Sequence, residues 1–430
     1  MEAPAAGAQH AGMDALPPPR APAFLATVAR APHRLLFAVG AGNVLLAMAW
    51  WALWLADQRW QLSGLRQPAA YAGWIHAVVM QYQVLAPFMF GFLLTVFPRW
   101  MGLDELGRWH YVPVGAGLFG GQLLTLAGAF GPAHLLHLGA VCTLAGWVAG
   151  LVYLLRWLWR DGGRTWHAVS CAGAMLLGLA GLLAWAAFLH GGDARLAFAS
   201  IKLGTWGLLL PVYFTVAHRM FPFFAGNMVP GYVPWRPLWV LAAFWPLALL
   251  HLGFELVHGY QWLWIADAPL LALACLWSWR NWPRAGAGGM RGNRAQQALL
   301  RVLFRGYAWL PIALALYLAQ SAVYALHGGF VLGRAPAHAL FVGFFGSLLV
   351  AMVTRVTQGH SGRPLELGGA AAFAWIAIQV VAVLRVAAEL LPDPMAWQAL
   401  AALGWLLAFT PWVLRSLRIY ATPRVDGKPG

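Results

Sequence analysis

Two histidines stand at matching places in two long apolar segments of this chain. His76 lies near the start of the segment 71–97, and His338 lies near the start of the segment 336–357. If both segments are helices that run in the same direction, the two imidazoles lie at the same depth. Two neutral imidazoles at one depth on facing helices are the arrangement that axial ligation of a haem iron requires. The alternative is that both are ordinary residues of a membrane interface.

The surroundings of these histidines suit a macrocycle with acidic side groups. Small residues that would leave room for the ring lie nearby: Ala77, Ala337, Ala339 and Gly343. Lys202 and Arg385 lie inside apolar segments, toward the same side of the membrane as the two histidines, and can hold haem propionates. An ionisable residue near the membrane centre costs on the order of 3 kcal/mol, so it usually faces a partner or a cavity. For Arg385 the alternative is an i,i+4 ion pair with Glu389.

A second group of candidate ligands follows in another apolar segment. His251, Glu255 and His258 are spaced i, i+4, i+7 and therefore share one helix face. Imidazole suits copper or iron, and a carboxylate can complete or orient such a site. The alternative is that Glu255 and His258 simply lie at the outer mouth of the segment.

The elements that must position these residues are transmembrane helices. The chain is 61% hydrophobic and only 10% charged, whereas a soluble domain carries roughly 25% charged residues. A helix of roughly 20 apolar residues spans a bilayer. Twelve such segments are predicted, which makes an all-α membrane protein: 35–55, 71–97, 111–129, 134–158, 167–189, 195–218, 236–257, 260–280, 303–326, 336–357, 368–391 and 396–419.

The distribution of basic residues predicts the orientation. A net charge of +15 is typical of proteins that bind nucleic acid, but here the charge follows the topology. With both termini on one side, almost all of the 28 lysines and arginines fall on that side. The exceptions are Arg59, Arg66, Arg195 and Arg334 on the other side, and Lys202 and Arg385 within segments. Because basic loops stay inside, we expect a protein of a bacterial inner membrane with cytoplasmic termini and no nucleic-acid partner.

The rest of the chain is expected to be short tails and one loop. Residues 1–34 predict a disordered cytoplasmic N-terminal tail, and residues 421–430 a C-terminal one. Between them, 35–420 form one transmembrane domain, interrupted by a Gly/Arg-rich segment, 281–302, that predicts a flexible cytoplasmic loop.

The second, sixth and tenth segments end alike, which predicts three four-helix units. In each, an arginine lies four residues after a small residue at the cytoplasmic edge: Thr95 and Arg99, Thr215 and Arg219, Ala351 and Arg355. Internal repeats are common in membrane folds. The alternative is that these arginines only anchor helix ends on the positive side.

Several motifs together resemble the NnrS family of bacterial membrane proteins. The most specific follows the tenth segment, where Gly359-His360-Ser-Gly362-Arg363-Pro-Leu comes after Val353-Thr-Arg355 and His338-Ala-Leu. Two others are Gly91-Phe-Leu-Leu-Thr95 with Pro98, Trp100 and Gly102, and Arg219-Met-Phe-Pro-Phe-Phe. The resemblance implies a twelve-helix protein that holds haem, of b type, and also copper, and that serves the response to nitric oxide or a nitrosyl species and resistance to nitrosative stress.

The chain departs from the family at one place. The second helix of the family usually reads Trp-His-x-His-Glu-Met, whereas here it reads Ile75-His76-Ala-Val78-Val79-Met80. The first histidine and the methionine are kept, but valines replace the second histidine and the glutamate.

A weaker resemblance reaches the catalytic subunit of haem–copper oxidases, which has twelve helices in three arcs of four. Its second helix is similar to His76-Ala-Val-Val-Met80 with Pro87 and Gly91-Phe92, and its low-spin haem is held at positions that match His76 and His338. The motifs of the oxygen-reducing centre are missing, which argues against a terminal oxidase or a standard nitric oxide reductase. We therefore expect no catalytic residues. The alternative function is a secondary transporter or metal-handling permease in which Lys202, Glu255 and Arg385 line a polar path.

Overall fold

The structure is a computed structural model that describes residues 24–284 and 289–427, and within them it is all helical. Twelve helices are long and apolar enough to cross a membrane, as the composition predicted. Apart from the short α1 (Phe24–Val28), they are α2 (Pro32–Trp60), α3 (Ala72–Val78) with η1 (Val79–Val84) and α4 (Leu85–Met101), η2 (Arg108–His110) with α5 (Val112–Phe130), α6 (Ala133–Asp161), α7 (Trp166–Leu189), α8 (Ala194–Lys202) with η3 (Leu203–Leu209) and α9 (Leu210–Met228), α10 (Leu238–Leu256), η4 (Tyr260–Trp262) with α11 (Trp264–Asn281), α12 (Arg294–Tyr307) with α13 (Trp309–His327), α14 (Ala335–His338) with η5 (Ala339–Gly346) and α15 (Ser347–Ser361), α16 (Gly369–Ala387) and α17 (Pro394–Ala421).

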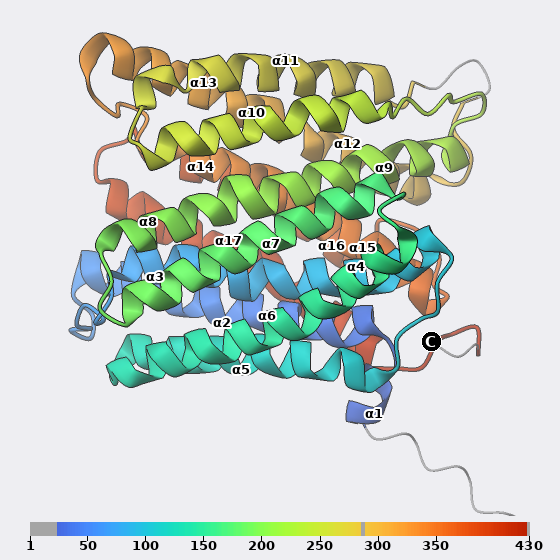
Figure 1. The fold of residues 1–430 in the computed structure, drawn as a ribbon, viewed down its shortest axis with the longest axis horizontal. Helices are drawn as coiled ribbons and strands as arrows, with labels where there is room; N and C mark the ends of the chain where they lie inside the picture. The colour runs from blue at the N-terminus through green and yellow to red at the C-terminus, as the bar shows by residue number, and fades with distance from the viewer. Residues whose placement is uncertain (1–23, 285–288, 428–430) are drawn as a thin grey trace, which may run out of the picture.

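The helices run side by side along one axis, so the molecule has two ends (Figure 1). One end holds α1 and the C-terminus, and we call it the terminal end. The opposite end holds the starts of α3, α8 and α14, and we call it the distal end (Figure 1). The second, sixth and tenth spans therefore all run from the distal to the terminal end, as their charge pattern predicted.

Some boundaries differ from those expected. Of the predicted N-terminal tail, residues 1–23 lie outside the described residues, whereas α1 and the start of α2 occupy its last part. α12 begins at Arg294, inside the segment 281–302 that we expected to be a loop. Asn293 and Gln296 cap this helix reciprocally, since the side chain of each accepts a hydrogen bond from the backbone N–H of the other, both at 2.9 Å. The first turn of α12, Arg294-Ala-Gln-Gln, is polar and therefore lies outside the apolar run 303–326 that predicted this span.

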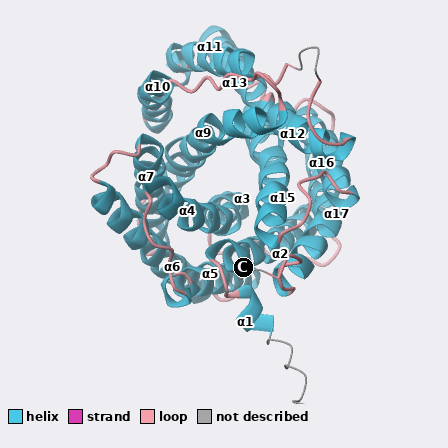
Figure 2. Ribbon diagram, turned by 90° about the vertical axis from the view of Figure 1, so that its right-hand side faces the viewer, coloured by secondary structure: helices cyan, strands magenta, loops and turns pink. Residues whose placement is uncertain are grey.

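The twelve spans form three consecutive units of four. The second span of each unit lies toward the middle, as the end-on view of α4, α9 and α15 shows (Figure 2). Their apolar windows are the most completely buried of the twelve, at 89%, 61% and 83%. Adjacent units meet where α6 packs on α7, where α11 packs on α13, and where α17 packs on α2. The last contact closes the units into a ring.

The three central spans share a feature that sequence reasoning missed. Each contains a π-helical segment, namely η1, η3 or η5, and no other span does among the described residues. A π-helical segment inserts extra residues into a turn and is frequent at functional sites. Its recurrence in equivalent helices supports the predicted threefold repeat. In each central span the π-helical segment begins within three residues after a candidate site residue, namely His76, Lys202 or His338.

The first unit is held by close helix contacts and a buried polar layer. α5 and α6 approach so closely that a Cβ on Gly117 would lie 2.5 Å from the Cα of Gly146, as is usual for membrane helices that associate through small residues. Next to this contact, the Gln83 amide donates to the hydroxyls of Thr125 and Thr143, at 3.0 and 2.9 Å. Such hydrogen bonds give buried polar groups the partners that lipid cannot supply.

Polar contacts stabilise the packing of α2 and α17 at both ends of the bundle. At the distal end, Arg59 of α2 donates to the carboxylate of Asp393, which precedes α17, at 2.7 Å. These hydrogen bonds from Arg59 lower the pKa of the Asp393 carboxyl. At the terminal end, Arg34 of α2 donates to the carbonyl of Tyr420 in α17 at 3.4 Å.

Candidate functional site

The structure brings His76 and His338 close together near the distal end. His338 lies within electrostatic range of His76, Arg334 and Arg385, and both imidazoles remain half-buried rather than fully enclosed. The Nδ1 of His338 is 2.9 Å from the carbonyl oxygen of Arg334. Because a carbonyl can only accept, Nδ1 carries the proton, and Nε2 is left with a free lone pair in the neutral ring.

The ring of His76 is held by stacking. It lies on Trp51 of α2, with 4.1 Å between the ring centroids and 9° between the planes. This stacking limits the rotation of the His76 ring. Two of the small residues expected to leave room are packed instead, since Ala339 is fully buried and a Cβ on Gly343 would lie 2.4 Å from the Trp309 ring. The room beside the histidines lies at Ala77 and Ala337, which are half-buried.

The two predicted propionate partners are separated. Arg385 lies within electrostatic range of both His76 and His338, and it also makes the i,i+4 pair with Glu389, at 2.6 Å. Lys202 instead binds Glu255, with 2.6 Å between Nζ and Oε1. The structure therefore groups Arg385 with the two histidines and places Lys202 in a different cluster.

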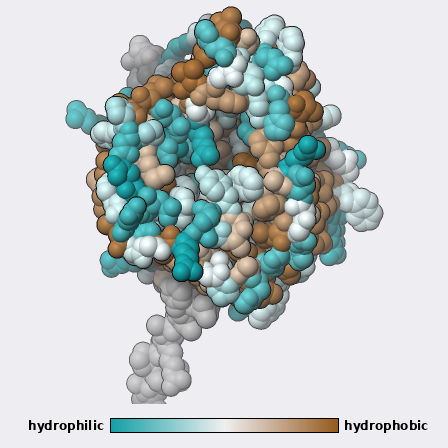
Figure 3. Space-filling view, turned by 90° about the vertical axis from the view of Figure 1, so that its left-hand side faces the viewer, coloured by the Kyte–Doolittle hydropathy of each residue, from teal (hydrophilic) through white to brown (hydrophobic). Residues whose placement is uncertain are grey.

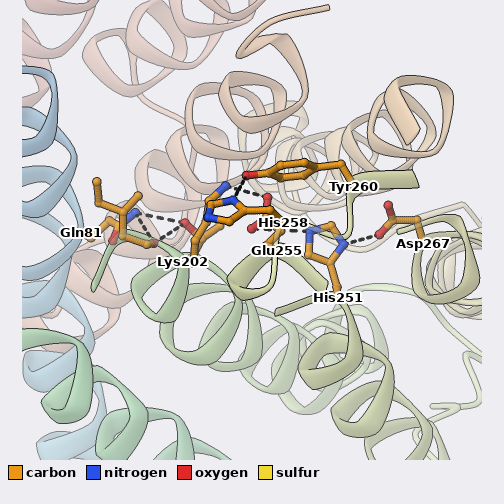
Figure 4. A network of polar contacts seen from close by, with 9 residues as sticks. Gln81, Lys202, His251, Glu255, His258, Tyr260 and Asp267 are labelled. Carbon is orange, nitrogen blue, oxygen red and sulfur yellow. Dashed lines mark hydrogen bonds and ion pairs between the residues drawn. The ribbon is translucent and has the colours of Figure 1, made fainter. Parts of the chain in front are cut away.

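That second cluster is a row of buried polar side chains (Figure 4). Lys202 binds Glu255, whose other oxygen faces the Nε2 of His251 at 3.8 Å, and the Nδ1 of His251 contacts Asp267 at 2.6 Å. Beside Lys202, the Gln81 amide donates a hydrogen bond to the carbonyl of Ile201 at 3.2 Å. We call Lys202, Glu255, His251 and Asp267 the charge row.

His258 does not join His251 and Glu255 as the spacing suggested. α10 ends at Leu256, and His258 adopts a left-handed backbone with a φ of 57°. Its exposed ring contacts the Tyr260 hydroxyl at 2.9 Å (Figure 4). Among the described residues, no three His, Cys, Asp or Glu side chains are arranged to hold a metal ion. The helical spacing failed here because the helix stops before its third member.

The distal end itself is a polar surface. Hydrophilic residues gather on this face of the molecule, between patches of hydrophobic ones (Figure 3). A separate pair of histidines, His137 and His190, lies at this end, with 3.4 Å between their Nδ1 atoms. His190 is exposed, whereas His137 is half-buried like His76 and His338.

The turn that ends the tenth span has a structural role. Gly362 caps α15 with a φ of +71°, and a Cβ there would lie 2.7 Å from the Asp426 carboxylate. Arg424 donates to the His360 carbonyl at 2.8 Å, Val425 N–H donates to the Ser361 carbonyl at 3.1 Å, and Arg363 donates to the Thr422 hydroxyl at 3.4 Å. The turn therefore holds the C-terminal segment. Gly359 makes only an ordinary contact, with Leu365.

Two of the three repeated arginines contact the central span of the preceding unit. Arg219 lies over the Trp100 ring, 4.5 Å from its centroid, and Arg355 lies over the Phe224 ring at 4.0 Å. Cation–π contacts of this kind favour Arg. The third, Arg99, pairs with Glu105 at 3.1 Å instead. The two cation–π contacts join the first central span to the second, and the second to the third, at the terminal end.

The space between the central spans is apolar. A cavity there is lined by side chains of α2, α4, α9 and α15, among them Met89, Phe92, Val216, Met352 and Val356. The side chains that line this cavity are hydrophobic, apart from the Tyr213 hydroxyl.

Two participants were missed in the sequence, Asp267 and Gln81. Asp267 is fully buried in α11, and its charge inside an apolar segment was a signal that could have identified it. Gln81 lies five residues after His76 in the same span, and an uncharged amide gives no comparable signal.

One comparison with known proteins identifies a family. A family model described as "NnrS protein" matches residues 27–424, nearly the whole chain. No curated protein and no solved structure matches.

Proposed function

Because the chain belongs to the NnrS family, we propose that it is a haem-binding membrane protein of the nitric oxide response, with His76 and His338 as axial ligands. The observation that carries this proposal is that two half-buried imidazoles, from the second and tenth spans, lie within electrostatic range of each other and that one of them has its Nε2 free. We propose protection from nitrosative stress as its physiological context, in keeping with its family.

The residues around these histidines fit a haem. The Arg334 carbonyl fixes the tautomer of His338, the Trp51 ring orients His76, and Arg385 supplies a guanidinium within electrostatic range of both. A bound haem b would supply one-electron redox chemistry. If His76 and His338 held the iron from both sides, the residues of this chain would favour electron transfer or sensing over direct binding of a gas.

Copper is not part of the proposal. The helix that was expected to supply a copper site offers His251 and Glu255, which are already engaged by Asp267 and Lys202, while His258 contacts Tyr260. These residues do not fit a metal ion as they stand.

The transporter alternative receives less support. A polar path would have to continue from the charge row past the central spans, and the cavity between those spans is lined by hydrophobic side chains. The positive-inside pattern supports a bacterial inner membrane with both termini in the cytoplasm, which we include in the proposal.

An optical spectrum of the purified protein tests the haem. We expect sharp bands on reduction, as two histidine ligands give a low-spin iron, and we expect His76→Ala or His338→Ala to reduce the haem content or to shift these bands. His190→Ala is the matched control, because it removes an exposed histidine of the same end that also has its Nδ1 on an i−4 carbonyl, that of Ala186. A full and unshifted haem complement in both His76→Ala and His338→Ala would overturn the assignment.

Growth under nitric oxide tests the physiological part of the proposal. A strain that lacks the gene should grow more slowly under a nitric oxide donor, and the unaltered gene should restore growth whereas His338→Ala should not. Equal growth of the deleted and parent strains would count against a role in nitrosative stress without touching the haem assignment.

A further inference from the structure

The charge row is buried inside the membrane domain although it contains four ionisable groups. The side chains of Asp267 and His251 are 0% exposed and that of Glu255 is 3% exposed, whereas that of Lys202 is 22% exposed. The row therefore has one open end, at Lys202 near the distal end, and one closed end, at Asp267.

The row lacks one positive charge. Asp267 and Glu255 each carry a negative charge when ionised, and Lys202 carries one positive charge. An uncompensated charge inside the membrane is costly, so buried ionisable groups pair with opposite charges. A single further positive charge on His251 would make the row neutral.

Three atoms of the row have no hydrogen-bond partner in the part of the chain that the structure describes: His251 Nε2, Glu255 Oε2 and Asp267 Oδ2. His251 uses Nδ1 to contact Asp267, and its Nε2 faces Glu255 Oε2 at 3.8 Å. Of the three atoms, only Nε2 becomes positive when it takes up a proton. A proton on Nε2 would therefore form an ion pair with the Glu255 carboxylate.

Aromatic rings enclose this pair. Trp206 stacks on His251 with 3.4 Å between the ring centroids, and the Tyr317 ring stands edge-on to it at 5.2 Å. The titratable or charged groups that face His251 are Glu255 on its own helix, Asp267 from α11, Tyr317 from α13 and, beyond Glu255, Lys202 from α8.

We propose that the charge row is a binding site for one exchangeable proton, held on His251 Nε2 opposite the Glu255 carboxylate and exchanged with the distal surface at Lys202. The proton comes from water at that surface and forms an N–H bond with the Nε2 lone pair, and no other bond is made or broken. The net charge of the row changes from −1 to neutral, and release returns the proton to water. The proposal does not depend on the haem.

The protonation state of His251 can be measured directly. With ¹⁵N-histidine in the full chain in lipid bilayers, solid-state NMR distinguishes a ring with two protonated nitrogens from a ring with one. We expect one buried histidine with both nitrogens protonated at pH 7, and His251→Gln should remove that signal. A singly protonated His251 at pH 7 would overturn the proposal.

Two variants that keep His251 should move the signal in opposite directions, so the test does not require His251→Gln to fold. Glu255→Gln makes the row neutral without a proton on His251, so the doubly protonated signal should be lost at pH 7. Lys202→Met removes a positive charge, so the signal should persist to a higher pH than in the unaltered chain. Glu105→Gln, an exposed carboxylate near the terminal end, is the control and should change nothing.

A metal cation could supply the same charge, and the measurement separates the two. If sodium or potassium occupies the row, raising its concentration at pH 7 should convert His251 to the singly protonated form, which would overturn the proton assignment. Glu255→Gln with an unchanged signal would also overturn it, because it would show that the charge balance does not govern His251.

Discussion

Gln81 of the second span donates a hydrogen bond to the hydroxyl of Thr205 in the sixth, at 3.1 Å. Gln81 also donates to the Ile201 carbonyl, and it lies five residues beyond His76, while its acceptors flank Lys202. One buried amide thus joins the helix of the proposed haem ligand to the helix that begins the charge row (Figure 4).

Replacing this amide tests how much the hydrogen bonds between the two spans contribute to the stability of the protein. We expect Gln81→Leu to lower the free energy of unfolding by about 1–3 kcal/mol, because it leaves buried acceptors without their donor. Thermal unfolding in detergent measures the change. Gln58→Leu is the control, since Gln58 is exposed and makes a single bond, to the Leu65 carbonyl; an equal loss in both variants would show that Gln81 has no special role.

The charge beside the two histidines should control the redox potential of a bound haem. A nearby cation favours the reduced iron, so Arg385→Gln should make the potential more negative. Glu389→Gln should do the opposite, because Glu389 partly neutralises Arg385 at 2.6 Å. Potentiometric titration of the optical bands measures both. Shifts of the same sign in the two variants would contradict the placement of this ion pair beside the haem.

Close packing of α5 on α6 predicts strong sensitivity at one glycine. Gly117→Val should destabilise the protein by about 1–3 kcal/mol, because its Cβ would meet the backbone of Gly146 at 2.5 Å and neither helix can move away freely. Thermal unfolding and protein yield in the membrane measure this effect. Gly120→Ala, whose Cβ would have nothing within 4 Å, should be neutral or slightly stabilising, since Ala favours a helix by ~1 kcal/mol over Gly.

The turn that follows the tenth span should hold the C-terminal segment. Gly362→Ala strains a backbone with a φ of +71° and pushes against Asp426, so we expect a loss of about 1–2 kcal/mol and faster protease cleavage within residues 421–427. Limited proteolysis followed by mass spectrometry measures the cleavage. Gly369→Ala, at the start of α16 with nothing within 4 Å of its Cβ, should leave cleavage unchanged.

The sequence predicted the membrane spans well because lipid imposes a strong and simple constraint on length and polarity. It also predicted the parallel course of the central spans, from which the common depth of His76 and His338 follows. It failed for α12, whose first turn is polar, and it could not predict that α10 stops before His258. Helical spacing groups residues only while the helix continues.

The carboxylates that pair with Lys202 and Arg385 were harder to predict than the membrane spans. The sequence offered Lys202 and Arg385 as equivalent cations, but Glu255 binds the first and Glu389 the second. The Arg385 pair follows the i,i+4 spacing within one segment, as the alternative predicted. The Lys202 pair depends on which helices become neighbours, because Lys202 lies in α8 and Glu255 in α10. Periodicity within one helix contains no information on such contacts, so the charge row became visible only in three dimensions.

The contact between α17 and α2 has a consequence for how the chain could be connected. Since the first and last spans pack together and both chain ends emerge at the terminal end (Figure 1), the ring of units has no structural beginning. A circular permutant that joins the present ends by a flexible linker and opens the chain at the turn 162–165, between the first and second units, should therefore still assemble. Tolerance of such a cut at a boundary between units, and intolerance of one inside a unit, would identify the four-helix unit as the building block from which the whole domain arose.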